Sequence, residues 1–205
     1  MKYKWLNKED SNKKIILFFN GWGMDEEIVN HLNCEDYNVL MFYNYNSLDT
    51  DFDWKSIEPY LEKNLIAWSM GVMVGTLFFK SDCLSQTVAI NGTLKPIDTE
   101  FGIHPKIYDL TIRGFNEKGR ERLINSMFEE NFKNFHQREL KEQHSELIAL
   151  KNYIANEDFN YNKILISEND KIIPTKSQTK FWAIKPNLKG GHCPFLQFTK
   201  WRELL

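Results

Sequence analysis

A lone serine, Ser69, stands between two apolar runs, and its surroundings are those of a possible nucleophile. The run before it reads NLIAW and the run after it reads MGVMVGTLFF. A serine hydroxyl is a poor nucleophile unless a base lies within hydrogen-bond reach and a third group orients that base. Two positions before and after the serine stand Ala67 and Gly71, small residues that suit a tight strand-to-helix turn. The alternative is a helix N-cap, where serine is among the preferred residues.

Two later loops contain the other residue types that such a serine needs. Asp170 follows an apolar run in SENDKIIPT, and two glycines and a proline flank His192 in LKGGHCPF. An aspartate in a loop can instead be a turn residue, and a lone histidine is more often structural. The chain order Ser69, Asp170, His192 is the order of nucleophile, acid and base in α/β-hydrolases. The three residues together favour a catalytic triad over three unrelated structural roles.

A glycine-rich loop, FFNGWGMD, follows an earlier apolar run and could supply part of an oxyanion hole. In α/β-hydrolases one donor is the backbone N–H after the nucleophile, and the second comes from a loop after an earlier strand. We therefore assign these roles to the backbone N–H groups of Met70 and Trp22. Gly21 and Gly23 let the backbone of this loop turn closely. The alternative is a glycine turn around a core tryptophan.

Short apolar runs alternate with amphipathic segments along most of the chain. We expect strands at residues 15–19, 37–43, 64–68, 87–91 and 163–167, and a possible edge strand in KYKWL. Helices are expected after a cap at Asp25, around Ile57, and at residues 70–80. The alternation predicts an α/β-hydrolase fold, with a mostly parallel central sheet and helices on both faces. Ser69 would then lie at the carboxyl-terminal edge of the sheet.

Residues 98–160 interrupt this alternation, because they contain no good strand but two helical patterns. The patterns are EKGRERLINSMFEEN and RELKEQHSELIALKNYIANE. An apolar stripe in the second pattern consists of Leu140, Leu147, Leu150 and Ile154. A helical insertion between two core strands can form a lid over an active site. We interpret residues 1–205 as one domain with residues 98–160 as a helical cap. The alternative is a pair of ordinary surface helices.

Composition restricts the classes of function. The chain has 205 residues and a formal net charge of −2, so it can bury one sizeable core and has no overall basic field for nucleic acid. No apolar run is long enough to span a membrane, and the charged start lacks the apolar region of a signal peptide. The three cysteines fit neither a disulfide framework nor a zinc ribbon. We expect a reduced, cytoplasmic protein that uses no metal or cofactor and binds neither nucleic acid nor membranes.

Taken together, the motifs FFNGWGMD, AWSMGV, INGT, GIHP, SENDKIIP and GGHCPF resemble the BioG-type pimeloyl-[acyl-carrier protein] methyl ester esterases of biotin synthesis. The resemblance extends from about residue 15 to residue 198. It implies Ser69 as the nucleophile, His192 as the base and Asp170 as the acid. The N–H groups of Trp22 and Met70 are then the oxyanion donors. The chain departs from the pattern in having an alanine two residues before the serine, and in a cap whose sequence does not match in detail.

By this resemblance, the reaction removes a methyl group from the far end of a pimeloyl chain carried on acyl carrier protein (ACP). An extended apolar chain suits an aromatic-lined channel, and candidate lining residues are Trp22, Trp68, Phe128 and Phe132. Core packing is the alternative for each. ACP is acidic, so a basic docking face is expected. Candidates are the four arginines of the cap, Arg113, Arg120, Arg122 and Arg138. Acidic residues stand beside them, so a solvated helix of mixed charge is the alternative.

Three functions are compatible with the sequence alone. The first is a carboxylic ester hydrolase, the second a thioesterase or acyltransferase with the same triad, and the third a hydrolase-fold protein that binds a small molecule without turnover. The motifs do not separate the first two, because all these enzymes form an acyl-serine. A binding protein has no need of all three polar residues, which argues against the third.

Overall fold

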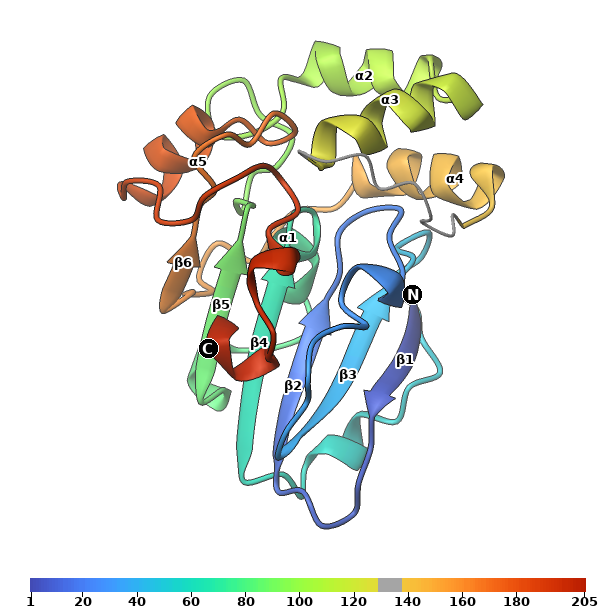
Figure 1. The fold of residues 1–205 in the computed structure, drawn as a ribbon. Helices are drawn as coiled ribbons and strands as arrows, with labels where there is room; N and C mark the ends of the chain where they lie inside the picture. Colours follow the sequence, from blue (N-terminus) through green and yellow to red (C-terminus); the bar gives the residue numbers. More distant parts are fainter. Residues whose placement is uncertain (129–137) are drawn as a thin grey trace.

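A computed structural model describes residues 1–128 and 138–205, and the strands in these residues form one central sheet. The sheet has the strand order β1-β3-β2-β4-β5-β6 (Figure 1). The strands are β1 (Lys2–Asn7), β2 (Lys14–Phe19), β3 (Tyr37–Tyr43), β4 (Glu62–Trp68), β5 (Gln86–Ile90) and β6 (Lys163–Leu165). β1 pairs with β3 in antiparallel fashion, and the other neighbouring strands are parallel. The predicted α/β fold with a mostly parallel sheet is confirmed.

The central strands are buried because they are continuous apolar runs. Residues 15–19 of β2 and 39–42 of β3 have 0% of their surface exposed. Such runs are typical of parallel strands that are covered on both faces. Four aromatic residues stack on β2 and β3 with ring centroids between 4.9 and 5.8 Å apart: Phe19, Phe42, Trp54 and Phe78. This packed core fixes the positions from which the loops at the strand ends begin.

The connections between the early strands are shorter helices than the sequence predicts. η1 (Glu26–Ile28), η2 (Trp54–Ile57) and η3 (Ser81–Cys83) are 3-10 turns, and α1 spans only Gly71–Gly75. The cap at Asp25 is confirmed, since its carboxylate accepts a hydrogen bond from the Glu27 N–H. The helix predicted over residues 70–80 is confirmed only for 71–75. Its sequence GVMVG contains two glycines and two valines, which have low helix propensity.

The longer helices of the described chain lie over the edge at which the parallel strands end (Figure 1). α2 (Pro105–Arg113), α3 (Glu117–Met127) and α4 (Leu140–Leu150) fall between β5 and β6 in the chain, and α5 (Thr175–Trp182) follows β6. α3 and α4 match the two predicted patterns, whereas α2 and α5 were not predicted. Ile154 is 80% exposed and lies beyond the end of α4, so its place in the apolar stripe is wrong. The cap interpretation of residues 98–160 stays a prediction.

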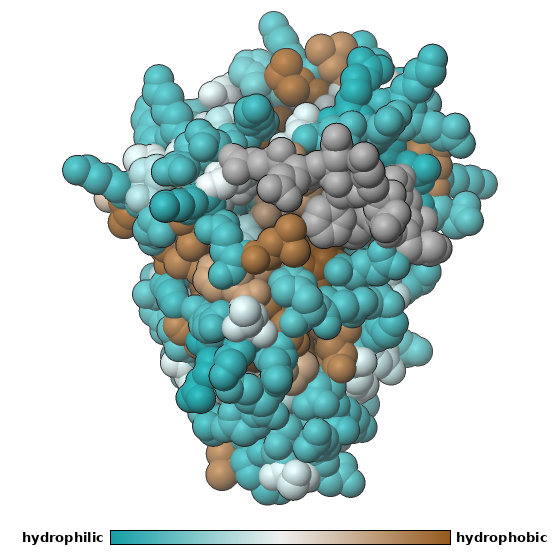
Figure 2. Space-filling model, in the orientation of Figure 1, coloured by the Kyte–Doolittle hydropathy of each residue, from teal (hydrophilic) through white to brown (hydrophobic). Residues whose placement is uncertain are grey.

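The end of the chain packs back onto the sheet through two 3-10 turns, η4 (Phe195–Gln197) and η5 (Trp201–Leu204). Phe195 and Trp201 contact the Phe18 ring edge-on, with centroids 5.7 and 5.1 Å away. The face drawn in Figure 2 is mostly hydrophilic, with separate hydrophobic patches. No helix among the described residues is long and apolar enough to cross a membrane.

Candidate active site

Ser69 occupies the sharp turn between β4 and α1. Its φ is 58°, in the left-handed region that residues other than glycine rarely adopt. Its backbone N–H donates to the Ile90 carbonyl of β5 at 2.9 Å, which ties the turn to the neighbouring strand. A strained turn of this kind exposes a serine oxygen at the edge of an α/β-hydrolase sheet. The N-cap interpretation of Ser69 is wrong, because Met70 takes that position and no side chain caps α1.

The residues that flank this turn are small for a steric reason. A Cβ placed on Gly71 would lie 2.2 Å from the carbonyl oxygen of Phe19 and 2.6 Å from that of Asn20. Before the serine, Ala67 is fully buried in β4, where it pairs with Phe19 on one side and Ala89 on the other. The close approach therefore requires a glycine after the serine, whereas β4 accommodates a methyl group before it.

The three polar residues singled out from the sequence are in direct contact. The Ser69 hydroxyl donates to His192 Nε2 at 2.8 Å, and His192 Nδ1 donates to Asp170 Oδ2 at 2.8 Å. The exposed fraction is 5% for Ser69, 6% for Asp170 and 1% for His192. With its proton on Nδ1, the imidazole has a lone pair on Nε2 that can take the serine proton. The arrangement is able to activate Ser69 as a nucleophile.

The Asp170 carboxylate is oriented by its own loop and by α5. Its Oδ1 accepts hydrogen bonds from the N–H groups of Ile172 at 2.8 Å and Ile173 at 3.1 Å. Its Oδ2, which faces His192, also accepts from Gln178 Nε2 at 2.8 Å. The sequence analysis missed Gln178, because it lies on the unpredicted helix α5 and belongs to no recognisable motif. These donors leave the carboxylate one orientation, and that orientation faces the imidazole.

The backbone of the His192 loop is bound by two side chains from the sheet. Trp68 Nε1 and Asn91 Nδ2 donate to the His192 carbonyl at 2.9 and 2.8 Å. Asn91 directly follows β5 with a φ of 46°, and its side chain also bonds to Ser167 in both directions. It therefore links the loop of the histidine to the loop of the aspartate. The sequence analysis missed Asn91; the available signal is an asparagine before a glycine at the end of a predicted strand.

The two residues assigned as oxyanion donors lie beside Ser69. Trp22 and Met70 both line the cavity that contains Ser69 and His192. Neither backbone N–H donates to an acceptor within the described residues. A Cβ on Gly21 would lie 2.7 Å from the Trp68 ring, so the loop runs directly against the turn that holds the serine. The arrangement is compatible with the assigned role, which stays a prediction.

An apolar cavity of about 110 Å³ begins at Ser69 and His192. Residues of the sheet edge and residues of α2, α3 and α4 form its wall. The larger apolar lining residues are Trp22, Trp68, Met70, Ile103, Ile107, Tyr108, Leu123, Met127, Leu147 and Ile172. The Tyr108 hydroxyl donates to the Leu147 carbonyl at 2.9 Å, and burial raises the pKa of Tyr108, so the phenol stays neutral. A cavity of this kind can enclose part of an extended apolar chain.

The four aromatic residues predicted to line a channel have different positions. Trp22 and Trp68 border the cavity. Phe128 is 8% exposed and packs in the core, outside the set of lining residues, so the alternative of core packing holds for it. Phe132 lies outside the described residues.

The four arginines predicted to form a docking face do not share one environment. Arg113 and Arg122 are exposed, and Arg120 is half-buried, with its guanidinium donating to the Arg138 carbonyl at 3.2 Å. Arg138 is only 8% exposed and forms an ion pair with the buried Glu146 at 2.8 Å. The assignment of Arg138 to a docking face is therefore wrong. The sequence gives the residue type but not the direction in which the side chain turns.

Cys193 follows the histidine directly but offers no competing nucleophile. Burial raises the pKa of its thiol to about 12, so the thiol stays protonated near neutral pH. Within residues 1–128 and 138–205, no group of three or more His, Cys, Asp or Glu side chains could hold a metal ion. The expectation that the protein uses no cofactor stays a prediction.

The sequence matches a known family along nearly its whole length. The family described as pimeloyl-ACP methyl esterase BioG matches residues 1–204. A curated relative, the malonyl-[acyl-carrier protein] O-methyltransferase of Bacteroides fragilis, is 35% identical over 181 residues. The match covers 83% of this chain but 36% of that relative, so this chain spans about a third of the relative's length.

Solved structures agree with this match. BioG from Haemophilus influenzae superimposes with a TM-score of 0.90 at 30% identity, over 100% of this chain and 99% of that one. The enol-lactonase from Burkholderia xenovorans LB400 gives a TM-score of 0.68 at 11% identity, over 96% of this chain and 90% of that one. The second likeness shows the fold alone. The predicted α/β-hydrolase fold is confirmed.

Proposed function

Since this chain belongs to the BioG family of pimeloyl-ACP methyl esterases, we propose that it is a serine carboxylic ester hydrolase that demethylates pimeloyl-[acyl-carrier protein] methyl ester in biotin biosynthesis. The observation that supports this most is the 2.8 Å contact of the Ser69 hydroxyl with His192 Nε2, with Asp170 behind the imidazole. An apolar cavity begins at the same serine. A nucleophile, an oriented base and space for an apolar acyl chain are what this reaction needs.

In the first half of the reaction, Ser69 Oγ attacks the carbonyl carbon of the methyl ester while His192 Nε2 takes the hydroxyl proton. Asp170 keeps the imidazole in the Nδ1–H tautomer and stabilises the imidazolium that forms. The N–H groups of Trp22 and Met70 hold the negative charge that develops on the carbonyl oxygen. The bond to the methoxy oxygen then breaks, and methanol leaves with the proton from His192.

In the second half, water cleaves the acyl-serine. His192 removes a proton from the attacking water, and the second tetrahedral intermediate collapses by returning that proton to Ser69 Oγ. The products are the free carboxylate and the regenerated serine. Thioesterases and acyltransferases share the acyl-serine. The preference for a methyl ester therefore depends on which group the cavity brings to Ser69.

We assign residues 98–160 as a cap over this cavity. Tyr108 of α2, Leu123 of α3 and Leu147 of α4 contribute to the same wall as Trp68 of the sheet. An insertion that forms one wall of a site can move to admit substrate and close to exclude water. The pimeloyl chain would lie along these apolar side chains, with its ester end at Ser69.

A substrate carried on ACP makes ACP the partner of this protein, and we assign its docking to exposed basic side chains of the cap. Arg113 and Arg122 are exposed. Arg122 also lines a surface groove that shares Ile107 and Leu123 with the catalytic cavity. The carrier could therefore bind there while its acyl chain enters the cavity, and its acidic surface would face the arginines. From this proposed partner and reaction, we assign the protein to the cytoplasm.

The test is to follow two bonds of one substrate. Purified protein is incubated with pimeloyl-ACP methyl ester, and methanol and the free ACP thiol are measured separately. We expect methanol to form while the thioester to ACP stays intact, and the Ser69→Ala variant should release neither. Release of the ACP thiol instead would identify a thioesterase. No turnover and no labelling of Ser69 by a fluorophosphonate would identify a binding protein.

A further inference from the structure

Helix α4 is bound directly to the loop that carries Trp22, although the two are far apart in the sequence. Trp22 Nε1 donates to the Gln143 carbonyl at 2.9 Å, and Gln143 Nε2 donates back to the Gly23 carbonyl at 2.8 Å. The Gly23 N–H donates to Glu146 Oε2 at 3.3 Å. Two residues of one face of α4 therefore hold the loop through both its carbonyl and its N–H groups.

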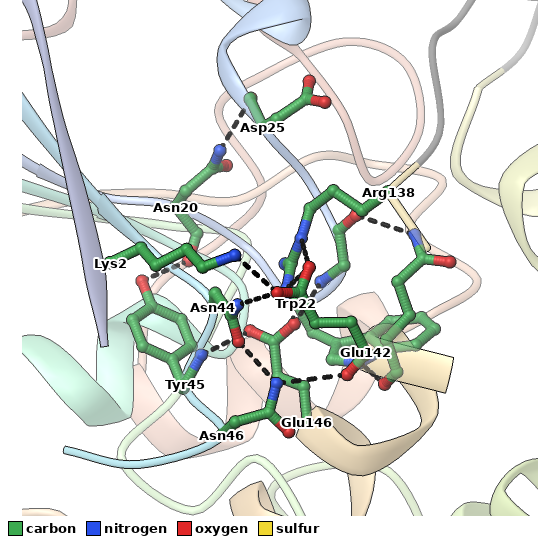
Figure 3. Close-up of polar contacts among 12 residues, drawn as sticks. Lys2, Asn20, Trp22, Asp25, Asn44, Tyr45, Asn46, Arg138, Glu142 and Glu146 are labelled. Carbon is green, nitrogen blue, oxygen red and sulfur yellow. Dashed lines mark hydrogen bonds and ion pairs between the residues drawn. The ribbon is translucent and has the colours of Figure 1, made fainter. Parts of the chain in front are cut away.

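Glu146 is the centre of this contact. Its exposed fraction is 0%, and Figure 3 shows its carboxylate with Tyr45 on one side and Arg138 and Trp22 on the other. Oε1 accepts from the Tyr45 N–H at 2.8 Å, and Oε2 accepts from Arg138 Nη1 at 2.8 Å in addition to Gly23. A fully buried carboxylate is costly to desolvate. This one is compensated by a paired cation and two backbone donors.

The peptide groups on both sides of the Trp22 N–H are held by hydrogen bonds. The Gly21 N–H donates to Asn20 Oδ1 at 2.8 Å, and Asn20 Nδ2 donates to the Asp25 carbonyl at 2.8 Å. On the other side, the Gly23 N–H is bound to α4. The Trp22 N–H between them has no acceptor within the described residues. Its flanking peptides are thus fixed while it is left available, which is the preorganisation that an oxyanion donor needs.

We propose that Glu146 is a positioning residue of the oxyanion hole. By binding the Gly23 N–H, Glu146 holds the Trp22 N–H toward the reacting carbonyl oxygen, and Gln143 supports the same loop by binding the Gly23 carbonyl. This rests on the proposed esterase function of Ser69. Glu146 does not touch the substrate in this role.

The ion pair of Glu146 with Arg138 supports the same role. An unpaired carboxylate next to the hole would oppose the negative charge that forms on the substrate. The Arg138 guanidinium, 2.8 Å from the carboxylate, opposes that charge while leaving the carboxylate oxygens in place as acceptors. Arg138 therefore allows the Glu146 carboxylate to bind the Trp22 loop without weakening the stabilisation of the oxyanion.

The experiment compares Glu146→Gln with Glu142→Gln, its matched control. Glu142 lies one turn earlier on α4 and accepts from the same Arg138 at 3.1 Å, but it does not bind the Trp22 loop. The two backbone donors of Glu146, the Tyr45 and Gly23 N–H groups, bind different carboxylate oxygens. A glutamine at 146 can accept from only one of them, because its amide nitrogen faces the other. For p-nitrophenyl butyrate we expect Glu146→Gln to lower kcat by about 10- to 100-fold with KM changed less than about twofold. Glu142→Gln should stay near the wild type.

A second readout separates positioning from general damage. A trifluoromethyl ketone, which becomes an oxyanion on Ser69, should bind Glu146→Gln more weakly by about the factor lost in kcat. Active sites are counted by fluorophosphonate labelling to completion, so that kcat is expressed per folded site. An unchanged kcat per labelled site would overturn the proposal, even if the melting temperature falls.

Gln143→Leu is a second variant, in case Glu146→Gln does not fold. It removes the hydrogen bond to the Gly23 carbonyl without leaving a buried charge. We expect kcat per site to fall about 3- to 10-fold. The proposal would be overturned if Gln143→Leu kept the kcat of the wild type while Glu146→Gln either failed to fold or was as active as the wild type. A wild-type protein that hydrolyses no ester would overturn the proposed function instead, so the two failures are distinguishable.

Discussion

Two turns meet at the reacting end of the cavity, and they are held in different ways. The turn between β4 and α1 is held by its own backbone: Ser69 has a φ of 58°, and Gly71 presses against a backbone carbonyl of β2. The loop after β2 is held by side chains of a distant helix, since Gln143 and Glu146 of α4 bind Gly23. One half of the proposed site is therefore built locally and the other half at long range.

The serine turn and the loop after β2 should therefore be disrupted by different mutations. A locally built turn depends on the residues beside it in the sequence and on the strand next to it. A loop held by α4 depends on every contact that keeps α4 in place, including the ion pair of Arg138 with Glu146. Helix α4 and the loop after β2 thus depend on one another, whereas the serine turn belongs to the sheet.

The largest effect should follow from Ser69→Ala. Removing the nucleophile of a triad costs on the order of 10⁴ to 10⁶ in rate, far more than the loss expected from moving one oxyanion donor. Hydrolysis of p-nitrophenyl butyrate measures it, with the melting temperature as the control for folding. More than ~10% residual activity in a folded variant would remove Ser69 from the nucleophile role.

The same division explains what the sequence analysis could and could not predict. Ser69 and Asp170 each follow a predicted strand, and His192 stands in a short motif flanked by glycines and a proline. The structure brings all three into contact. Burial of continuous apolar runs made the strands predictable as well. These features depend on residues within a few positions of one another.

The features that were missed depend on contacts between distant segments. Glu146 stands in a helix with no local signal for a partner in a loop far away. Gln178 was missed for another reason: its partner Asp170 lies only eight residues earlier, but helix α5 was not predicted. Arg138 looked like one more surface arginine in a charged helix, although its guanidinium turns inward to Glu146. The length of α1 was overestimated, because an apolar run after the serine resembles a helix whether or not the helix continues.

The second prediction tests the local half with two glycines of the same short helix. In Gly71→Ala the new Cβ would lie 2.2 Å from the Phe19 carbonyl oxygen, so backbone must move. In Gly75→Ala the nearest atoms would be 3.4 Å away, an ordinary contact. Overpacking costs about 1–3 kcal/mol, and the displaced serine should lower kcat on the order of 10²-fold. Gly75→Ala should be stable or slightly stabilised by its helix propensity. Equal behaviour of the two variants would contradict the steric explanation.

The third prediction separates two neighbouring cap arginines. Arg122 is exposed, whereas Arg120 donates to the Arg138 carbonyl and to Gln143 Oε1 at 3.4 Å. Arg122→Glu should reduce activity on the ACP-bound ester about tenfold more than on p-nitrophenyl butyrate, because only the former would use the proposed docking face. Arg120→Glu should reduce both to a similar extent, because it also disturbs the helix that holds the oxyanion loop.

Kinetics on both substrates with each variant give the ratio of the loss on the ACP-bound ester to the loss on p-nitrophenyl butyrate. Added salt should reproduce the effect of Arg122→Glu on the ACP-bound ester, since the screening length falls to ~3 Å at 1 M. A ratio near one for Arg122→Glu would move the docking face elsewhere. A ratio as high for Arg120→Glu as for Arg122→Glu would mean that the free ester does not depend on the support from α4.

The smallest effect concerns stability and compares two carboxylates one turn apart on α4. Burial raises the pKa of Glu146 above its ordinary value of 4.5, and Arg138 opposes the shift. Burial acts in the same direction on Glu142, but Lys2 and Arg138 outweigh it and lower the pKa of Glu142. Tyr45, which also faces Glu146, stays neutral because burial raises its pKa. The two carboxylates should therefore have opposite effects on how stability changes with pH.

A raised native pKa gives a contribution to stability that is fully present below the unfolded pKa and is lost as the pH rises through the native pKa. A lowered native pKa gives a contribution that is present above the unfolded pKa and is lost as the pH falls through the native pKa. The free energy of unfolding of the wild type minus that of Glu146→Gln should therefore decrease as the pH rises from below 4.5. The same difference for Glu142→Gln should increase over the rise to 4.5. Urea unfolding followed by tryptophan fluorescence at several pH values measures both. Slopes of the same sign would mean that Glu146 is not held as a buried acid between Arg138 and the loop, and the long-range support of the oxyanion loop would then have to come from Gln143.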